Sequence, residues 1–287
     1  PEYKPVQAWG GESGLRAAIT QMRADGANPI LYMNPTIWDC RTEAYQRYGA
    51  VWSAKSRAGS EYRESYAWTN TEASTRDRGK SFAVMCPTPE LNDFTLATVA
   101  RIAGYGGPSL HFDQMVRAFC CYDPHHHHVA PQRAAIDGYA QFLPKARQLL
   151  RQANSNAILS LEGMSEFHCQ YGDSCWNWSQ LAQCEPIRLS MPLTPYSHEL
   201  EAGETADVNR CFVKGLMMDF RTDGGDGLVA DYPHFAAHVR RVATLKRRVA
   251  PWLSRCLFED ALGLALTGEH FCGATYAAED GSYAVAV

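Results

Sequence analysis

Helix-like and strand-like hydrophobic patterns alternate along most of the chain. Apolar residues at helical spacing, with capping or glycine signals at the ends, predict helices at residues 13–25, 88–102, 134–153 and 233–254. Short apolar runs between them predict strands at residues 29–33, 81–85, 109–112, 157–161, 187–192 and 216–220. Because helices and strands alternate, the pattern predicts a parallel sheet whose strands are joined by crossover helices.

The length of the chain favours one large α/β domain. With 287 residues and 46% hydrophobic content, it can bury the core of a single barrel. We therefore expect a (β/α)8 TIM barrel over residues 1–265. Residues 9–11 look like a loop that enters a helix, which predicts a barrel that is incomplete at its N-terminus.

The last stretch of the chain has a different pattern. Two strand-like runs flank the turn Glu279-Asp280-Gly281-Ser282, which predicts a β-hairpin. The second run stops in mid-pattern, so the hairpin lacks the partners that a stable sheet needs. We expect residues 266–287 to begin a truncated all-β domain.

Two acids stand at the ends of predicted strands. Asp113 follows the run at 109–112, and Glu162 follows the run at 157–161. The carboxyl ends of barrel strands carry the chemistry of this fold, and paired carboxylates there are typical of glycoside hydrolysis. Both are candidate catalytic residues, and the polar neighbours His111 and Gln114 are candidate substrate-binding residues.

Aromatic and acidic residues in loops on the same face are further candidates for contacting a sugar. Aromatic rings stack on the flat apolar face of a pyranose, but they also fill ordinary cores, so both roles stay open. The candidates are Trp38 and Asp39 after the first strand, and Tyr171, Asp173, Trp176 and Trp178 after Glu162. Asp219, a third strand-end acid, could stabilise the transition state, replace a catalytic acid or cap a helix.

The cysteines and histidines give a weaker signal. Most of the ten cysteines are expected to be free thiols, with a bridge between Cys169 and Cys175 as the chief exception. No CxxC pair is present, which argues against a structural zinc site. The run His125 to His128 leaves a metal-dependent hydrolase as an alternative, although adjacent side chains cannot all face one ion. We expect no metal and no organic cofactor.

Charge and hydropathy limit the partners. The formal net charge is only −4 and both signs are scattered, so nothing favours binding to nucleic acid or an anionic membrane. No apolar run approaches the ~20 residues that span a bilayer. A neutral carbohydrate is the expected partner, and the compartment, cytoplasmic or exported, stays open.

Several stretches resemble an uncharacterised family of glycoside-hydrolase-like (β/α)8 barrels found mostly in bacteria. The similar stretches are His111-Phe112-Asp113-Gln114, Cys121-Tyr122-Asp123-Pro124-His125, the helix at 137–153 and Leu161-Glu162-Gly163. More distantly, the acids are placed as in retaining α-glycosidases of the α-amylase and endo-α-N-acetylgalactosaminidase type. In those barrels an Asp nucleophile ends strand four and a Glu acid/base ends strand five.

This resemblance implies that Asp113 is the nucleophile and Glu162 the acid/base. Barrels of the α-galactosidase type instead place the acid on strand six, which we expect near residues 191–196, where no acid stands at the strand end. The resemblance therefore implies a retaining α-glycosidase that acts on an oligo- or polysaccharide. The alternative from another class is a barrel that binds carbohydrate without cleaving it.

Overall fold

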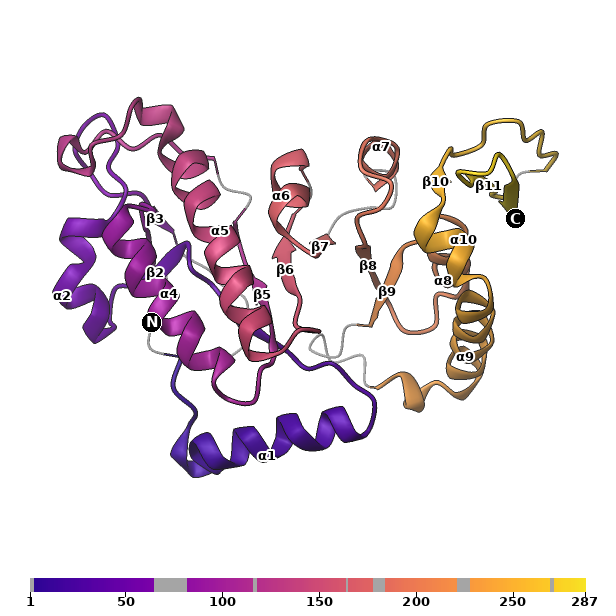
Figure 1. The fold of residues 1–287 in the computed structure, drawn as a ribbon, viewed down its shortest axis with the longest axis horizontal. Helices are drawn as coiled ribbons and strands as arrows, with labels where there is room; N and C mark the ends of the chain where they lie inside the picture. The colour runs from indigo at the N-terminus through magenta and orange to yellow at the C-terminus, as the bar shows by residue number, and fades with distance from the viewer. Residues whose placement is uncertain are drawn as a thin grey trace. The chain divides into compact units, whose positions relative to one another are not determined.

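The computed structural model describes residues 3–64, 82–115, 118–163, 165–177, 184–220, 228–268 and 271–287. The chain divides into two compact units, Pro1–Glu162 and Gly163–Val287. In Figure 1 the first unit runs from indigo to magenta and pink, and the second continues to yellow.

The first unit contains three parallel strands and the helices that pack on them. Its helices are α1 (Gly11–Ala24), α2 (Glu43–Trp52), α4 (Pro89–Ala103) and α5 (Ala134–Ala153), with short 3-10 turns at η1 (Gln7–Trp9), η2 (Pro124–His126) and η3 (Pro131–Arg133). Its parallel strands are β1 (Ile30–Met33), β5 (Ser109–Phe112) and β6 (Leu159–Glu162), with β5 in the centre.

Helices α4 and α5 begin within one residue of their predicted starts, whereas α1 begins at Gly11, two residues before the predicted start, and α2 was not predicted. Thr88 caps α4 by accepting a hydrogen bond from the backbone N–H of Leu91 at 3.3 Å, and Pro89 occupies the first turn. Helices α4 and α5 pack side by side (Figure 1). Phe142 of α5 stacks on Phe112 of β5, with ring centroids 5.5 Å apart. This packing buries the central strand and fixes the position where it ends.

A second, antiparallel sheet in the first unit departs from the predicted order. It consists of β2 (Ile37–Asp39), β4 (Phe82–Val84) and β3 (Arg63–Glu64), in the order β2-β4-β3. The run at 81–85 does form a strand, but β4 does not join the parallel strands, so that part of the predicted topology is wrong. A short apolar run shows that a strand forms, not which neighbour it pairs with.

The second unit repeats the alternation of helices with parallel strands. Its parallel strands are β7 (Ser174–Asn177), β8 (Tyr196–Leu200) and β9 (Met217–Phe220), in that order. Its helices are α6 (Glu166–Tyr171), α7 (Cys184–Ser190), α8 (Thr205–Val213), η5 (Val229–Asp231), α9 (Pro233–Arg248) and α10 (Ala250–Arg255). The helix predicted at 233–254 is interrupted at Val249, two residues before Pro251.

The strand predicted at 187–192 is wrong, because residues 184–190 form helix α7. A short apolar run fits a strand or a buried helix turn equally well. Arg188, only 3% exposed, donates from Nη1 to the backbone carbonyl of Pro192 at 2.5 Å and so closes the turn after the helix. The next strand, β8, begins only at Tyr196.

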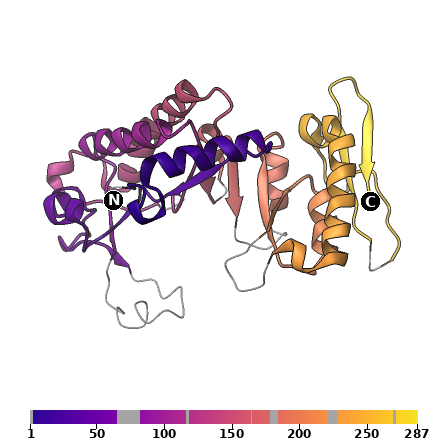
Figure 2. The same cartoon turned by 90° about the horizontal axis from the view of Figure 1, so that it is seen from below.

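The predicted hairpin is present. Strands β11 (Ala274–Ala277) and β12 (Tyr283–Ala286) pair antiparallel, and β10 (Leu257–Phe258) joins them as the third strand. Figure 2 shows the yellow hairpin beside the orange helices of the second unit. Tyr276 is fully buried there, and its hydroxyl donates to the carbonyl of Val213 at the end of α8, at 2.7 Å.

The α/β class is therefore confirmed, with three parallel strands in each unit, and the closed eight-stranded barrel stays a prediction. Within the part of the chain that the structure describes, every helix is too short or too polar to cross a lipid bilayer.

Candidate active site at three strand ends

The carboxyl ends of β1, β5 and β6 bring three polar residues into one row. β5 pairs with β1 on one side and with β6 on the other, and the backbone N–H of Asp113 continues the ladder to the carbonyl of Met33 at 2.9 Å. The next matched positions on the three strands are Asn34, Asp113 and Glu162. Side chains at matched positions of neighbouring strands point to the same face of a sheet. The two acids that the sequence singles out are therefore neighbours.

Asp113 is held by two side chains from the end of β1. The Tyr32 hydroxyl donates to its Oδ2, and Asn34 Nδ2 donates to the same oxygen at 2.9 Å. Partial burial of the hydroxyl, followed by its hydrogen bond to Asp113, raises the pKa of Tyr32, so this group remains a donor at neutral pH. Both donors bind the same carboxylate oxygen, Oδ2, and neither of them binds Oδ1.

Asn34 is itself fixed from several directions. It is 7% exposed, and its Oδ1 accepts hydrogen bonds from the backbone N–H groups of Thr36 and Ile37, each at 3.0 Å. Its own N–H donates to the Tyr3 hydroxyl at 2.7 Å. Burial raises the pKa of Tyr3 to about 12, so that hydroxyl also stays protonated. These bonds orient the Asn34 amide toward Asp113.

Glu162 is joined to the same site through the backbone of Gln114. Its Oε2 accepts the N–H of Gln114 at 2.6 Å, and the Gln114 side-chain oxygen accepts a bond from Asn34 Nδ2 at 3.3 Å. Gln114 has a φ of 59°, in the left-handed region that residues other than glycine rarely adopt. Such conformations occur most often at functional sites. We call Tyr32, Asn34, Asp113, Gln114 and Glu162 the carboxylate site.

His111 and Ser160 lie one layer below the two acids. They are paired in register on β5 and β6, and His111 Nδ1 lies 3.1 Å from Ser160 Oγ. Burial lowers the pKa of His111, although the charge of Asp113 acts in the opposite direction. The imidazole is therefore neutral near pH 7. The predicted contact between His111 and a substrate stays a prediction.

Tyr32 and Asn34 were not among the residues predicted for the site. Tyr32 lies within the strand predicted at 29–33, and Asn34 is the residue that follows this strand. Since side chains alternate along a strand, two polar residues spaced by two at its carboxyl end would face the same side as Asp113. That spacing, in a strand that ends beside the acid, was the available signal.

Trp38 and Asp39 were predicted to lie in a loop, and this prediction is wrong. They belong to β2, and Trp38 is 1% exposed because it packs against Trp52 and Phe94, with ring centroids 6.0 and 5.4 Å away. Asp39 forms an ion pair with Arg41 at 2.7 Å. A ring enclosed by its own core offers no face to a sugar, so we leave Trp38 out of the site.

The predicted residues of the second unit are partly brought together. Trp176 lies in β7 instead of a loop, and its indole N–H donates to Asp219 of β9. Tyr171 ends α6 and Asp173 follows it, while Trp178 lies outside the described residues. Contact of these side chains with a substrate stays a prediction.

The structure also changes where an acid of the α-galactosidase type could lie, as an alternative to Glu162. The strand after β6 is β7, and residues 174–180 contain no acid, which agrees with the argument against the α-galactosidase placement. The following strand, β8, contains Glu199 and is followed by Glu201, contrary to the expectation that no acid stands near its end. The reason is that α7 occupies the residues predicted as this strand.

The cysteines whose side chains the structure describes are free thiols, including Cys169 and Cys175. The bridge allowed between those two is therefore not formed. Cys169 instead lies 3.0 Å from the Tyr196 hydroxyl.

Comparison with known proteins assigns the chain to a family. A family model described as Domain of unknown function (DUF6259) matches residues 1–199. The chain belongs to this family. The matched stretch includes the whole carboxylate site of the DUF6259 chain. No match is found among the curated proteins.

The fold of the DUF6259 chain is similar to that of solved glycosidases. The α-N-acetylgalactosaminidase NagBb from Bifidobacterium bifidum, in its GalNAc complex, matches with a TM-score of 0.68 and 15% identity, over 100% of this chain and 47% of that chain. The α-galactosidase from Lactobacillus brevis matches with a TM-score of 0.57 and 11% identity, over 93% and 36%. The GH36 α-galactosidase AgaA from Geobacillus stearothermophilus gives 0.57 and 12%, over 93% and 37%. The DUF6259 chain thus spans less than half the length of these neighbours.

Proposed function

We propose that the carboxylate site is the catalytic centre of a retaining α-glycosidase. Asp113 is the nucleophile and Glu162 is the acid/base. The observation that carries the proposal is the row at the ends of β1, β5 and β6, in which two carboxylates occupy matched strand positions. They are linked by a chain of hydrogen bonds, because Asn34 donates to Asp113 and to the Gln114 side chain, and the Gln114 N–H donates to Glu162. The likeness of the fold to glycosidases supports the same reaction class.

The first step forms a glycosyl-enzyme. Asp113 attacks the anomeric carbon with Oδ1, because Oδ2 is occupied by the donors Tyr32 and Asn34. The glycosidic C–O bond breaks, and Glu162 in its protonated form gives its proton to the leaving oxygen. In the second step Glu162 takes a proton from water, whose oxygen attacks the anomeric carbon and releases the Asp113 carboxylate.

Retention, as opposed to inversion, is favoured by the placement on adjacent strands. Neighbouring strands lie about 4.8 Å apart, and retaining enzymes keep their carboxyl groups about 5–5.5 Å apart. Inverting enzymes need roughly 6.5–9.5 Å to admit a water molecule between the acid and the base on opposite faces of the sugar. Residues at matched positions on adjacent strands fit the shorter separation.

The substrate that we propose carries a terminal α-linked galactose or N-acetylgalactosamine. The structural neighbours are named as α-galactosidases and an α-N-acetylgalactosaminidase, so these sugars are the first to test. The purified protein is assayed against nitrophenyl α- and β-glycosides of both sugars and of glucose. Release of nitrophenol from one α-glycoside, with the sugar first released as the α-anomer, is the expected result.

Glu162→Gln tests the acid/base role. We expect hydrolysis of an alkyl or oligosaccharide glycoside to fall about 10²–10⁴-fold, with a smaller loss on an activated aryl glycoside whose leaving group needs no proton. Added azide should then restore turnover and yield an α-glycosyl azide, because a small anion needs no general base to attack the glycosyl-enzyme.

Glu199→Gln is the matched control, since it removes the competing acid on β8. If Glu199→Gln shows the leaving-group dependence and azide rescue while Glu162→Gln does not, the assignment of the acid/base is wrong. Binding of the sugar without turnover of any glycoside would favour the barrel that only binds carbohydrate.

A further inference from the structure

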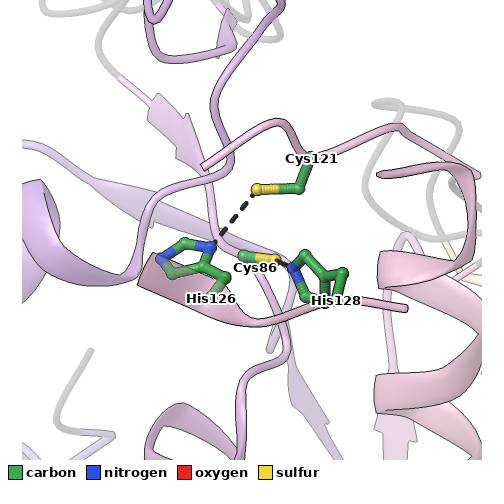
Figure 3. Close-up of side chains that lie close together, drawn as sticks. All are labelled: Cys86, Cys121, His126 and His128. Carbon is green, nitrogen blue, oxygen red and sulfur yellow. Dashed lines mark hydrogen bonds between the residues drawn. The ribbon is translucent and has the colours of Figure 1, made fainter. Parts of the chain in front are cut away.

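A second group of reactive side chains lies in the first unit, at different residues from the carboxylate site. Cys86, Cys121, His126 and His128 each direct one donor atom to a common point, and these four atoms lie within 4.8 Å of one another (Figure 3). We call them the Cys/His cluster. Cys86 follows β4, Cys121 lies in the loop after β5, His126 ends η2 and His128 comes two residues later. Within the described ranges, it is the one group of this kind.

We propose that the Cys/His cluster binds one Zn²⁺ ion as a structural site. Two thiolates and two imidazoles form a ligand set that Zn²⁺ takes in tetrahedral sites, with bonds of about 2.3 Å to sulfur and 2.0–2.1 Å to nitrogen. In such a tetrahedron the donor atoms lie roughly 3.3–3.8 Å apart. Cys86 Sγ lies 3.0 Å from His128 Nε2, and Cys121 Sγ lies 3.3 Å from His126 Nδ1. These two pairs need to separate by a few tenths of an ångström to admit the ion, whereas the other donor atoms, which lie within 4.8 Å of one another, need to move closer together.

Burial of the cluster indicates a closed site. Cys86 is fully buried, Cys121 is 1% exposed and His126 is 9% exposed, whereas His128 is half-buried. Four protein donors in the protein interior complete the coordination of Zn²⁺ and leave no position for a substrate. Soft thiolate ligands also select against Mg²⁺ and Ca²⁺, which prefer oxygen. The geometry thus fits a structural ion better than a catalytic one.

Neighbouring backbone groups orient the ligands in the way that metal sites require. His126 Nε2 donates to the carbonyl of Val51 at 2.7 Å, which orients Nδ1 toward the cluster. The backbone N–H of Lys55 lies 3.5 Å from Cys121 Sγ and donates to it. Both contacts come from α2 and the residues just after it. Ligating histidines commonly donate their second N–H to such a carbonyl.

The backbone turn explains how two of four consecutive histidines reach one point. His127 has a φ of 52°, in the left-handed region, and lies between the two ligands. Asp123 starts the turn by accepting the N–H of His125 at 2.9 Å. His126 and His128 therefore face the cysteines, while exposed His125 and His127 do not belong to the cluster.

Binding of Zn²⁺ changes the protonation of the two cysteines. Both sulfurs coordinate as thiolates, and the protons that they carry are released to solvent.

The ion would link two segments that lie far apart in the sequence. It would tie the end of β4 to the loop that leads from the end of β5 to α5, and this loop starts beside Asp113. Loops at the carboxyl ends of barrel strands shape the pocket. The inference does not depend on the proposed glycosidase activity, because metal content and activity are measured separately.

The experiment measures zinc in protein made without a polyhistidine tag and purified under reducing conditions. Elemental analysis is expected to find about one Zn²⁺ per chain, and Cys121→Ser is expected to lower this to below about one fifth. The matched controls Cys120→Ser and His125→Ala change the neighbouring cysteine and histidine outside the cluster, and both should retain the zinc. Zinc loss in these controls equal to that in Cys121→Ser would overturn the proposal.

Two measurements on the unaltered protein keep the test decisive if Cys121→Ser does not fold. Replacement of Zn²⁺ by Co²⁺ should produce thiolate-to-metal absorption in the near ultraviolet and the visible bands of tetrahedral cobalt. A strong chelator should lower Tm by at least about 5 °C, and added Zn²⁺ should restore it. Protein that contains no zinc, shows no cobalt spectrum and keeps its Tm in chelator would overturn the proposal, as would a disulfide between Cys86 and Cys121 under reducing conditions.

Discussion

The carboxylate site and the Cys/His cluster lie in the same unit but are built in opposite ways. The carboxylate site is formed by regular strand pairing, and Tyr32 at its edge is 57% exposed. The Cys/His cluster is formed by irregular segments between β4 and α5, and Cys86 in it is fully buried. Under the two proposals, a substrate has to reach the carboxylate site, whereas the Cys/His cluster has to enclose a structural ion.

This difference leads to different expectations for substitutions at the two places. The two acids of the carboxylate site should control turnover and contribute little to folding, because their hydrogen bonds lie at the ends of strands. Residues of the Cys/His cluster should control stability, because an unpaired buried thiolate or imidazole is costly. Substitutions that separate turnover from the free energy of unfolding test this contrast.

Asp113→Asn should have the largest effect on turnover. The amide keeps the shape of the side chain but is not a nucleophile, so we expect kcat/KM to fall at least about 10³-fold. The free energy of unfolding should change by less than about 1 kcal/mol, measured by urea denaturation. Asp137→Asn on helix α5, where the acid pairs with Arg133, is the control and should retain activity. Full activity of Asp113→Asn would show that the carboxylate site does not control turnover, and the contrast with the Cys/His cluster would be wrong.

Asn34→Ala should affect both properties. It removes the donor to Asp113 Oδ2 and the acceptor for two backbone N–H groups, so we expect kcat to fall about 10–100-fold and stability to fall by about 1–3 kcal/mol. Asn154→Ala is the matched control for this substitution. Asn154 also bridges a turn, because it donates to the carbonyl of Gly107 at 3.0 Å, but it lies at the opposite ends of the strands from the two acids. It should cost stability alone. An unchanged kcat in Asn34→Ala would mean that Asn34 only stabilises the turn.

The smallest expected effect is on the pH dependence of stability. Burial lowers the pKa of His111, so the unfolded chain binds more protons than the folded chain below about pH 6.5. The stability contributed by this neutral imidazole is present above that pH and is lost as the pH falls through it. His111→Asn should therefore reduce the slope of unfolding free energy against pH between about pH 7 and 5. If the slope of unfolding free energy against pH is the same in His111→Asn as in the unaltered protein, then protonation of His111 is not coupled to folding.

The sequence predicted the helices and the strand-end acids more accurately than their surroundings. Asp113 and Glu162 were found because each follows an apolar run that ends at a turn, which is a local feature. Helix α7 and strand β4 were misjudged in type or partner, since a short apolar run does not specify its neighbours. Trp38 was expected in a loop on the catalytic face, yet it is enclosed by Trp52 and Phe94, which only the folded chain brings together.

The Cys/His cluster could not be predicted from local sequence patterns. The absence of a CxxC pair argued against zinc, but Cys86 and Cys121 come from segments on either side of α4 and β5 and meet only after folding. The spacing of His126 and His128 is unremarkable until the left-handed turn at His127 directs both toward the cysteines.

By itself, the sequence determined the α/β class, the positions of the longer helices α1, α4, α5 and α9, and the two acids at strand ends, because helical periodicity, caps and apolar runs are encoded by residues close to one another. Only the tertiary structure decided that Asn34 and Tyr32 hold Asp113, that Gln114 reaches Glu162, and that two cysteines meet two histidines. Those contacts join residues far apart in the chain, and strand pairing and loop conformation set them through packing that no local pattern records.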